Sequence, residues 1–237
     1  MTPHIIHYCW FGGRPIPNSA RQCIASWKKW LPDYEIREWN EQNFDVNAHP
    51  YTRDAYAAGK YAYVSDFARY KILEEFGGIY FDTDVVVVAS LDDLLEKGAF
   101  MGIEQGNPVS VNPGLGVSCS PQHPFIKEMC CYYDTLSFYD AEGKPTSGFV
   151  VPGTTEHLLL HGFERENRYQ EVAGVSIYPA DYFDPMDNAT GKIKLSINTR
   201  TIHRYDRTWS NQSSFYIWLS RLWHRTWLYR LIQNYKA

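Results

Sequence analysis

Residues 61–88 constrain the fold more than any other part of the chain. The segment reads "YAYVSDFARYKILEEFGGIYFDTDVVVV": a run with helical apolar spacing, a stop at Gly77 and Gly78, and then an apolar β-branched run. This order predicts a helix, a tight turn and a strand over "IYFDTDVVVV" that is buried in a sheet. Two carboxylates, Asp82 and Asp84, interrupt the apolar run and need an explanation.

The spacing of the two aspartates indicates a cation site. Residues i and i+2 of a strand point to the same face, so the predicted strand would hold Asp82 and Asp84 roughly 6 Å apart. Their repulsion would be ~3 kcal/mol at an effective dielectric constant near 20, and a divalent cation would offset it. A D-x-D triplet arises often by chance, so the surrounding residues must support the interpretation.

The preceding helix supplies a second charged pair. On a helical wheel Asp66 and Arg69 lie with the apolar Ile72, Leu73 and Phe76, which places both charges on the inward face. Inward charges must be paired or bound to a ligand, so either a structural ion pair or a ligand site is predicted here.

The order of the remaining elements predicts an α/β fold. Strand and helix patterns alternate as βαβαβ over the first 90 residues and are mixed afterwards, as in a sheet with helices on both faces. The 237 residues suit one large domain with an appendage. We expect a catalytic domain over 1–210, with a donor-binding half over about 1–125 and an acceptor-side half over about 126–210, followed by a basic aromatic helix over 211–237.

Charge and termini narrow the partners. The net charge of −4 gives no reason to expect nucleic-acid binding. The start of the chain lacks a signal-peptide pattern, and no apolar run reaches the length of a membrane span. The five cysteines, of which Cys130 and Cys131 are adjacent, form no disulfide framework and suit a reduced compartment, so we expect a cytoplasmic protein. Residues 216–237 combine basic and aromatic residues at helical spacing, which predicts peripheral contact with the inner face of the cell membrane or, alternatively, packing on the domain or another subunit.

The central string resembles a known family. Glycosyltransferase family 32, and more distantly the clostridial glucosylating toxins, share the pattern S-D-x-x-R, a helix, G-G-x-Y and D-x-D. The matching residues are Ser65, Asp66, Arg69, Gly77, Gly78, Tyr80, Asp82 and Asp84, and "IIHYCWFGG" resembles the first strand of the family. The resemblance implies a GT-A-type, Rossmann-like nucleotide-sugar-binding fold with a mixed central sheet.

The resemblance also implies roles for individual residues. In the donor site, Trp10 would stack on the base beside Tyr8 and Cys9, and Asn112 would line the sugar pocket. Asp66 and Arg69 would hold the sugar hydroxyls and the diphosphate. The metal, Mn2+ or Mg2+, would be held by Asp82 through water, by Asp84 directly and by His203, and Trp209 would touch the leaving phosphate.

These observations predict a metal-dependent glycosyltransferase. It would move a sugar from a nucleotide-sugar donor, expected to be a UDP-sugar, to a glycan or lipid-linked saccharide, with retention at the anomeric carbon by family resemblance. A role in capsule or lipopolysaccharide assembly is the matching biological hypothesis. Two alternatives stay open: a phosphatase of the haloacid dehalogenase type with Asp82 as nucleophile, and a non-catalytic carbohydrate-binding module.

Overall fold

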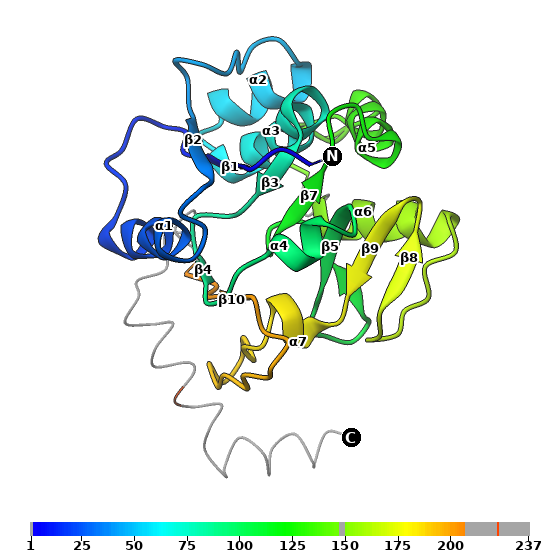
Figure 1. Cartoon of the computed structure of the whole chain (residues 1–237). Helices are drawn as coiled ribbons and strands as arrows, with labels where there is room; N and C mark the ends of the chain where they lie inside the picture. Colours follow the sequence, from blue (N-terminus) through cyan, green and yellow to red (C-terminus); the bar gives the residue numbers. More distant parts are fainter. Residues whose placement is uncertain (1, 147–149, 207–221, 223–237) are drawn as a thin grey trace.

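The computed structural model describes residues 2–146, 150–206 and 222, and its centre is a mixed sheet of eight strands (Figure 1). The strand order is β2-β1-β3-β7-β5-β9-β8, with β6 paired to β5. The strands of this sheet are β1 (Ile5–Cys9), β2 (Glu35–Trp39), β3 (Gly78–Tyr80), β5 (Ala99–Glu104), β6 (Ser110–Val111), β7 (Val117–Cys119), β8 (Gln170–Val172) and β9 (Val175–Tyr178).

Strand directions confirm the predicted α/β class with a mixed sheet. β1 pairs in parallel with β2 and β3, as the predicted βαβαβ order requires, whereas β7 runs antiparallel between β3 and β5. β9 is parallel to β5, and β8 closes the edge as an antiparallel strand.

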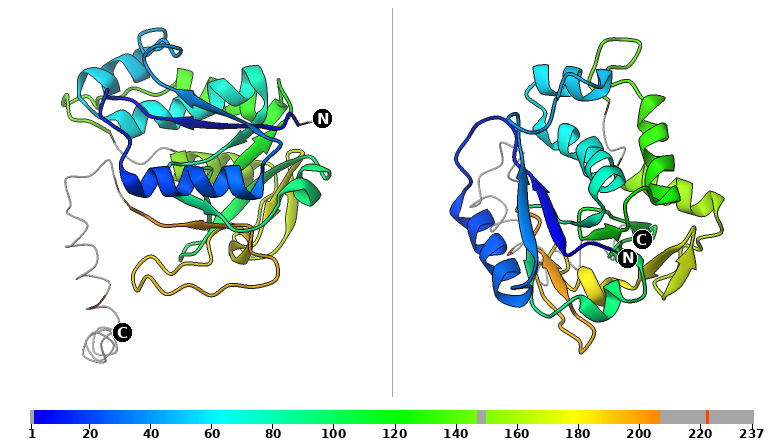
Figure 2. Two further views of the ribbon diagram at one scale, coloured as in Figure 1. Left: turned by 60° about the vertical axis from the view of Figure 1, so that its left-hand side comes forward. Right: turned by 45° about the horizontal axis from the view of Figure 1, so that its top comes forward.

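Helices cover both faces of the sheet (Figure 2). One face carries α1 (Asn18–Trp30) and α4 (Asp92–Leu95); the other carries α2 (Pro50–Ala57), α3 (Tyr61–Phe76), α5 (Pro124–Asp134) and α6 (Val150–Leu160), while the short α7 (Ala180–Phe183) precedes the last strand. Alternation along β5 separates the two cores, because Phe100 packs with α1 and α4 and Met101 with the opposite group. Within the described residues no helix is both long and apolar enough to cross a bilayer.

The predicted continuous strand over "IYFDTDVVVV" is wrong. β3 ends at Tyr80, the chain turns, and β4 (Val85–Val87) begins a separate two-stranded sheet with β10 (Thr201–His203). The amide of Val85 donates to the carbonyl of Asp82 at 3.1 Å, which closes a tight turn. Asp82 and Asp84 therefore lie in a turn and not on one face of a strand, because β4 leaves the large sheet and pairs with β10 instead.

The buried His7 of β1 hydrogen-bonds two neighbouring segments, and these contacts require a neutral ring. His7 is fully buried; the indole of Trp39 donates to Nδ1 at 3.0 Å, so Nε2 carries the proton and donates to the carbonyl of Gly77 at 2.8 Å. A charged ring would lose the Nδ1 acceptor. Burial accordingly lowers the pKa of His7 to about 4.

This geometry predicts acid sensitivity of the fold. The pKa of His7 falls from 6.5 to about 4 on folding. Its contribution to the free energy of unfolding is therefore complete above pH 6.5 and is lost as the pH falls from 6.5 towards 4. The loss over that window is ~3 kcal/mol of unfolding free energy. Chemical denaturation across this range checks it: His7→Gln should flatten the acid slope, whereas the exposed His4→Gln should keep it. Equal slopes in wild type and His7→Gln would contradict the assignment.

Candidate active site

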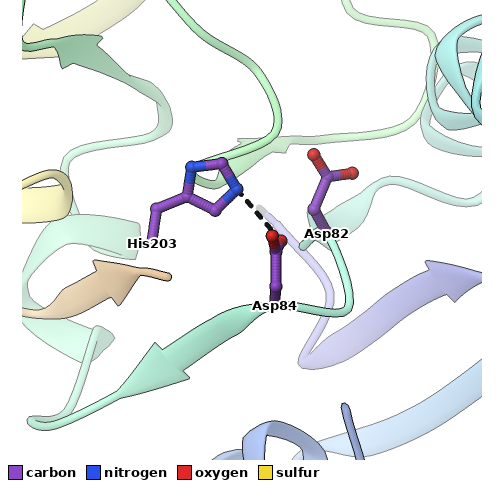
Figure 3. Close-up of side chains that lie close together, drawn as sticks. All are labelled: Asp82, Asp84 and His203. Carbon is purple, nitrogen blue, oxygen red and sulfur yellow. Dashed lines mark hydrogen bonds and ion pairs between the residues drawn. The ribbon is translucent and has the colours of Figure 1, made fainter. Parts of the chain in front are cut away.

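The turn between β3 and β4 meets the end of β10 at a cluster of three potential metal ligands (Figure 3). β10 pairs antiparallel with β4 and sets His203 opposite Val85, so His203 Nε2 lies 3.0 Å from Asp84 Oδ1. One ligand atom each from Asp82, Asp84 and His203 lies within 4.8 Å of the other two. The structure thus brings together the three residues predicted to bind the metal, although 119 positions separate Asp84 from His203.

Asp84 is held as a carboxylate. The amide of Asp206 donates to Asp84 Oδ2 at 3.0 Å, and His203 pairs with Oδ1. Burial opposes ionisation, but His203 and the backbone donors lower the pKa of Asp84 overall. For His203, burial also opposes the charge, yet Asp84 raises its pKa to about 9. A bound cation would replace this proton.

Arg69 connects the turn to α3. It is 3% exposed; Nη2 donates to Asp66 Oδ1 at 2.7 Å and lies 3.3 Å from Asp82 Oδ1, and Nε donates to the carbonyl of Ser65 at 3.2 Å. The guanidinium stands over the Tyr80 ring, 4.7 Å from its centroid. Within the described residues Nη1 has no hydrogen-bond partner. The predicted inward Asp66–Arg69 pair is confirmed, with an unused buried donor.

Asp66 shares this guanidinium with Asp82. Burial raises the pKa of Asp66 to about 7, Arg69 opposes that rise, and the charge of Asp82 adds to it. Arg69 therefore interacts with both carboxylates, and that of Asp82 is available to a ligand.

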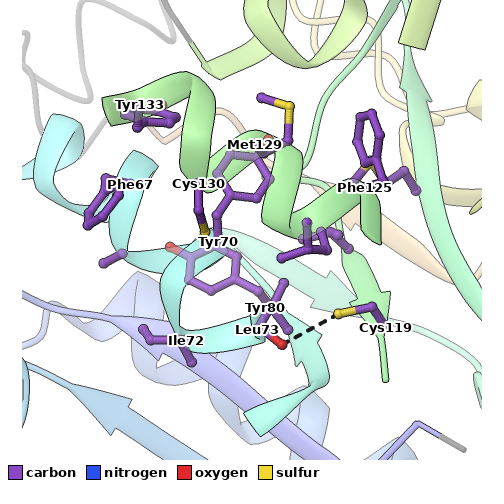
Figure 4. Close-up of a cluster of buried hydrophobic side chains, with 14 of the residues drawn as sticks. Phe67, Tyr70, Ile72, Leu73, Tyr80, Cys119, Phe125, Met129, Cys130 and Tyr133 are labelled. Carbon is purple, nitrogen blue, oxygen red and sulfur yellow. Dashed lines mark hydrogen bonds between the residues drawn. The ribbon is translucent and has the colours of Figure 1, made fainter. Parts of the chain in front are cut away.

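Helix α3 is fixed by the core beneath it (Figure 4). Tyr70 and Leu73 are fully buried and pack in one cluster with Met129 and Cys130 of α5. The Tyr70 hydroxyl also hydrogen-bonds Thr154 of α6 at 2.5 Å. Arg69 is thus presented from a rigid helix, which fixes its distance to the turn.

The loop after β6 supports Asp82 from the other side. Asn112 is buried, and its Oδ1 accepts from the Gly114 amide at 2.7 Å. The Gly114 carbonyl in turn accepts from the Asp82 amide at 3.1 Å, and the Tyr80 hydroxyl donates to Asp82 Oδ1 at 3.2 Å. A methyl group at Gly114 would overlap Asp82 Oδ2. Asn112 therefore acts on the site indirectly, because it binds Gly114 and Gly114 in turn binds Asp82.

The predicted base-binding residues are placed less directly. Cys9 is buried, and burial raises the pKa of its thiol to about 12, although the positive charge of Arg69 opposes this rise. The Tyr8 hydroxyl donates to Glu38 at 2.7 Å, and the half-buried Trp10 donates from its indole to the Arg14 carbonyl. Their donor-binding roles stay predictions. Trp209 and, except for Leu222, the predicted helix over 211–237 lie outside the described residues.

Four residues of the site were given no role by the sequence-based prediction. Tyr80 and Gly114 flank Asp82, Asp206 binds Asp84 through its amide, and the Tyr205 ring lies 4.1 Å from that of His203. Tyr80 had a signal, because it stands in the G-G-x-Y pattern. The other three act through backbone or tertiary contacts, and the sequence alone assigned them no role.

The donor set fits a divalent cation. Two carboxylates suit Mg2+ or Mn2+, while an imidazole ligand favours Mn2+ over the strictly oxygen-seeking Mg2+. In the described part of the chain, His203 Nδ1 has no hydrogen-bond partner, so the ring is not committed to a second contact.

Comparisons with known proteins indicate a glycosyltransferase. Residues 17–101 match the family described as "Glycosyltransferase sugar-binding region containing DXD motif". The match agrees with the resemblance seen in the sequence, and Asp66, Arg69, Asp82 and Asp84 all lie within it.

Individual relatives cover part of the chain. It is 36% identical over 131 residues to "Uncharacterized glycosyltransferase L373" of Acanthamoeba polyphaga mimivirus, which is 52% of each protein. It is 29% identical over 130 residues to "Mannosyl phosphorylinositol ceramide synthase SUR1" of Saccharomyces cerevisiae, which is 53% of this chain and 33% of the yeast protein. Among solved structures, "PaToxG Glycosyltransferase" aligns with a TM-score of 0.46 at 20% identity, covering 55% of this chain and 59% of that one. The chain therefore spans about half the length of the viral relative and one third of the yeast one.

Proposed function

We propose that this protein is a metal-dependent glycosyltransferase that takes a sugar from a nucleotide-sugar donor. The observation that carries the proposal is the meeting of Asp82, Asp84 and His203 beside the buried Arg69. The two aspartates and the arginine lie within the matched residues 17–101, and His203 joins them from β10. A nucleotide-sugar has a diphosphate that needs cations and a sugar whose hydroxyls need acceptors, and the site offers both.

Each group has a defined task in this proposal. Asp82, Asp84 and His203 would hold the cation, which when bound supplies Lewis-acid stabilisation of the leaving diphosphate. Arg69 offers an unused N–H to an anionic oxygen without reorganising, because Asp66 and Asp82 already fix it. The same carboxylates accept hydrogen bonds from sugar hydroxyls and stabilise positive charge developing on the ring.

Donor and acceptor are proposed more finely as follows. The donor is a UDP-sugar, the cation is Mn2+, the acceptor is a glycan or lipid-linked saccharide, and the transfer retains the anomeric configuration. The name of the yeast relative describes a mannosylated inositol phospholipid, which supports a lipid acceptor and puts mannose among the sugars to test. We further propose that the protein works at the inner face of the cell membrane, in assembly of a capsule or lipopolysaccharide.

Thermal unfolding with a ligand panel tests the proposal. UDP, GDP and their hexose conjugates are added with and without Mn2+, and a ligand at 100 times its dissociation constant should add ~2.7 kcal/mol of stability. We expect a rise in Tm with one nucleotide class that requires Mn2+, followed by slow hydrolysis of the matching nucleotide-sugar. Binding of free saccharide alone would favour the carbohydrate-binding module, and release of phosphate from simple phosphate esters would favour the phosphatase.

A further inference from the structure

The segment between α7 and β10 projects an unusual surface. Residues 192–197, "KIKLSI", are all exposed, and they form part of the hairpin at the lower edge of both views in Figure 2. Three of them are large aliphatic residues: Ile193 is 49% exposed, Leu195 65% and Ile197 94%. We call residues 192–197 the aliphatic ridge.

The ridge is held in place by hydrogen bonds. The Asp187 amide donates to the Lys192 carbonyl at 2.9 Å, and the Lys194 amide donates to the Pro185 carbonyl at 3.0 Å. The Ser196 hydroxyl donates to Asp181 Oδ2 at 2.8 Å. An ordered backbone therefore holds the aliphatic side chains in solvent, where their hydration is unfavourable in free energy.

The charge of the ridge is positive. Lys192 and Lys194 alternate with the aliphatic residues, and neither forms a salt bridge with a described residue. The neighbouring carboxylates of Asp187 and Asp181 accept hydrogen bonds from Thr190 and Ser196 and keep their charge, and Lys194 helps to lower the pKa of Asp187. An occupant must accept apolar side chains and also offer anionic groups.

We propose that the aliphatic ridge docks on the surface of an anionic lipid bilayer. Ile193, Leu195 and Ile197 would enter the acyl boundary while Lys192 and Lys194 contact lipid phosphates. Separately exposed side chains suit a fluid interface, which closes around each of them, whereas a protein partner would have to present a matching groove. The proposal concerns residues 192–197 and does not depend on the enzymatic activity.

Docking of the aliphatic ridge would also determine where the candidate active site lies relative to the bilayer. Thr201, the first residue of β10, follows the ridge by four positions, and His203 ends that strand at the cation cluster. A docked ridge would therefore hold the candidate active site close to the bilayer surface.

Vesicle co-sedimentation of the full chain tests the proposal. Wild type should bind vesicles of phosphatidylcholine with about 30% phosphatidylglycerol and bind pure phosphatidylcholine much more weakly. Lys192→Gln with Lys194→Gln should weaken binding to the anionic vesicles about 30-fold, at roughly 1 kcal/mol for each lysine. Ile193→Ser, Leu195→Ser and Ile197→Ser together should weaken it at least about tenfold. Leu160→Ser is the matched control, because Leu160 is an aliphatic residue 80% exposed on α6, and it should bind as wild type.

The contrary outcomes are equally specific. No binding by wild type, or unchanged binding by both ridge variants, overturns the proposal; in the second case another surface makes the contact. Loss of a dimer in the triple serine variant, measured by analytical ultracentrifugation without any vesicle binding, would assign the ridge to contact between copies and overturn it too. If the triple variant fails to unfold cooperatively, the lysine pair alone decides.

Discussion

Asp84→Asn should lower metal-dependent donor turnover by ~10³-fold, because a carboxylate ligand is lost and with it several kcal/mol of charge stabilisation. The fold should survive. An asparagine Oδ1 can still accept from the Asp206 amide, and its amide can donate to a neutral His203 Nε2, so both contacts seen for Asp84 have a replacement.

Donor hydrolysis with Mn2+, together with thermal unfolding, measures both effects. Asp93→Asn is the matched control, since Asp93 is an exposed acid paired with Arg200 at 2.9 Å and should tolerate the change with full activity. A folded Asp84→Asn protein with wild-type, Mn2+-dependent turnover would remove Asp84 from the cation site. An unfolded one would show that its role is structural.

Gly114→Ala should cost about 100-fold in turnover while every charged group remains. The added methyl would overlap Asp82 Oδ2 and come within 3.0 Å of Asn112 Oδ1, so the carboxylate must swing away from its present place. Asp82 is partly exposed and can move, which spares the fold, but a shift of about 1 Å at a reacting group commonly costs 10²-fold.

The comparison variant is Gly106→Ala in the same region. There the nearest atom to a new methyl is the Pro108 carbonyl oxygen at 3.6 Å, an ordinary contact, so turnover should not change. Steady-state kinetics at saturating Mn2+ separates the two. Equal turnover in both variants would mean that the position of Asp82 is not set by the loop.

Local periodicity in the sequence was enough to predict part of this site. The wheel of α3 placed Asp66 and Arg69 inward, and the structure pairs them at 2.7 Å, because helical spacing fixes which residues share a face. The βαβαβ order and the mixed sheet were predictable for the same reason: apolar patterns and glycine stops are local signals.

Where the outcome depended on distant partners, local signals failed. The apolar residues on both sides of Asp82 and Asp84 suggested one strand, yet Tyr80 and Val85 belong to different sheets. The choice is made by β10, whose backbone pairs with β4 and which lies more than 100 residues away. The support of Asp82 by Gly114 is likewise a tertiary contact between backbone groups, which no residue pattern encodes.

The pairing of β4 with β10 has a consequence for biosynthesis. Residues 17–101 leave the ribosome first, but His203, the third residue of the proposed cation site, follows Asp84 by 119 residues, about 6 to 24 s later at ordinary rates of translation. Until then the nascent chain displays two acidic residues and an arginine without the histidine that completes them. If the proposed cation site is correct, chains that terminate before β10 but keep the DXD motif should not bind the ion.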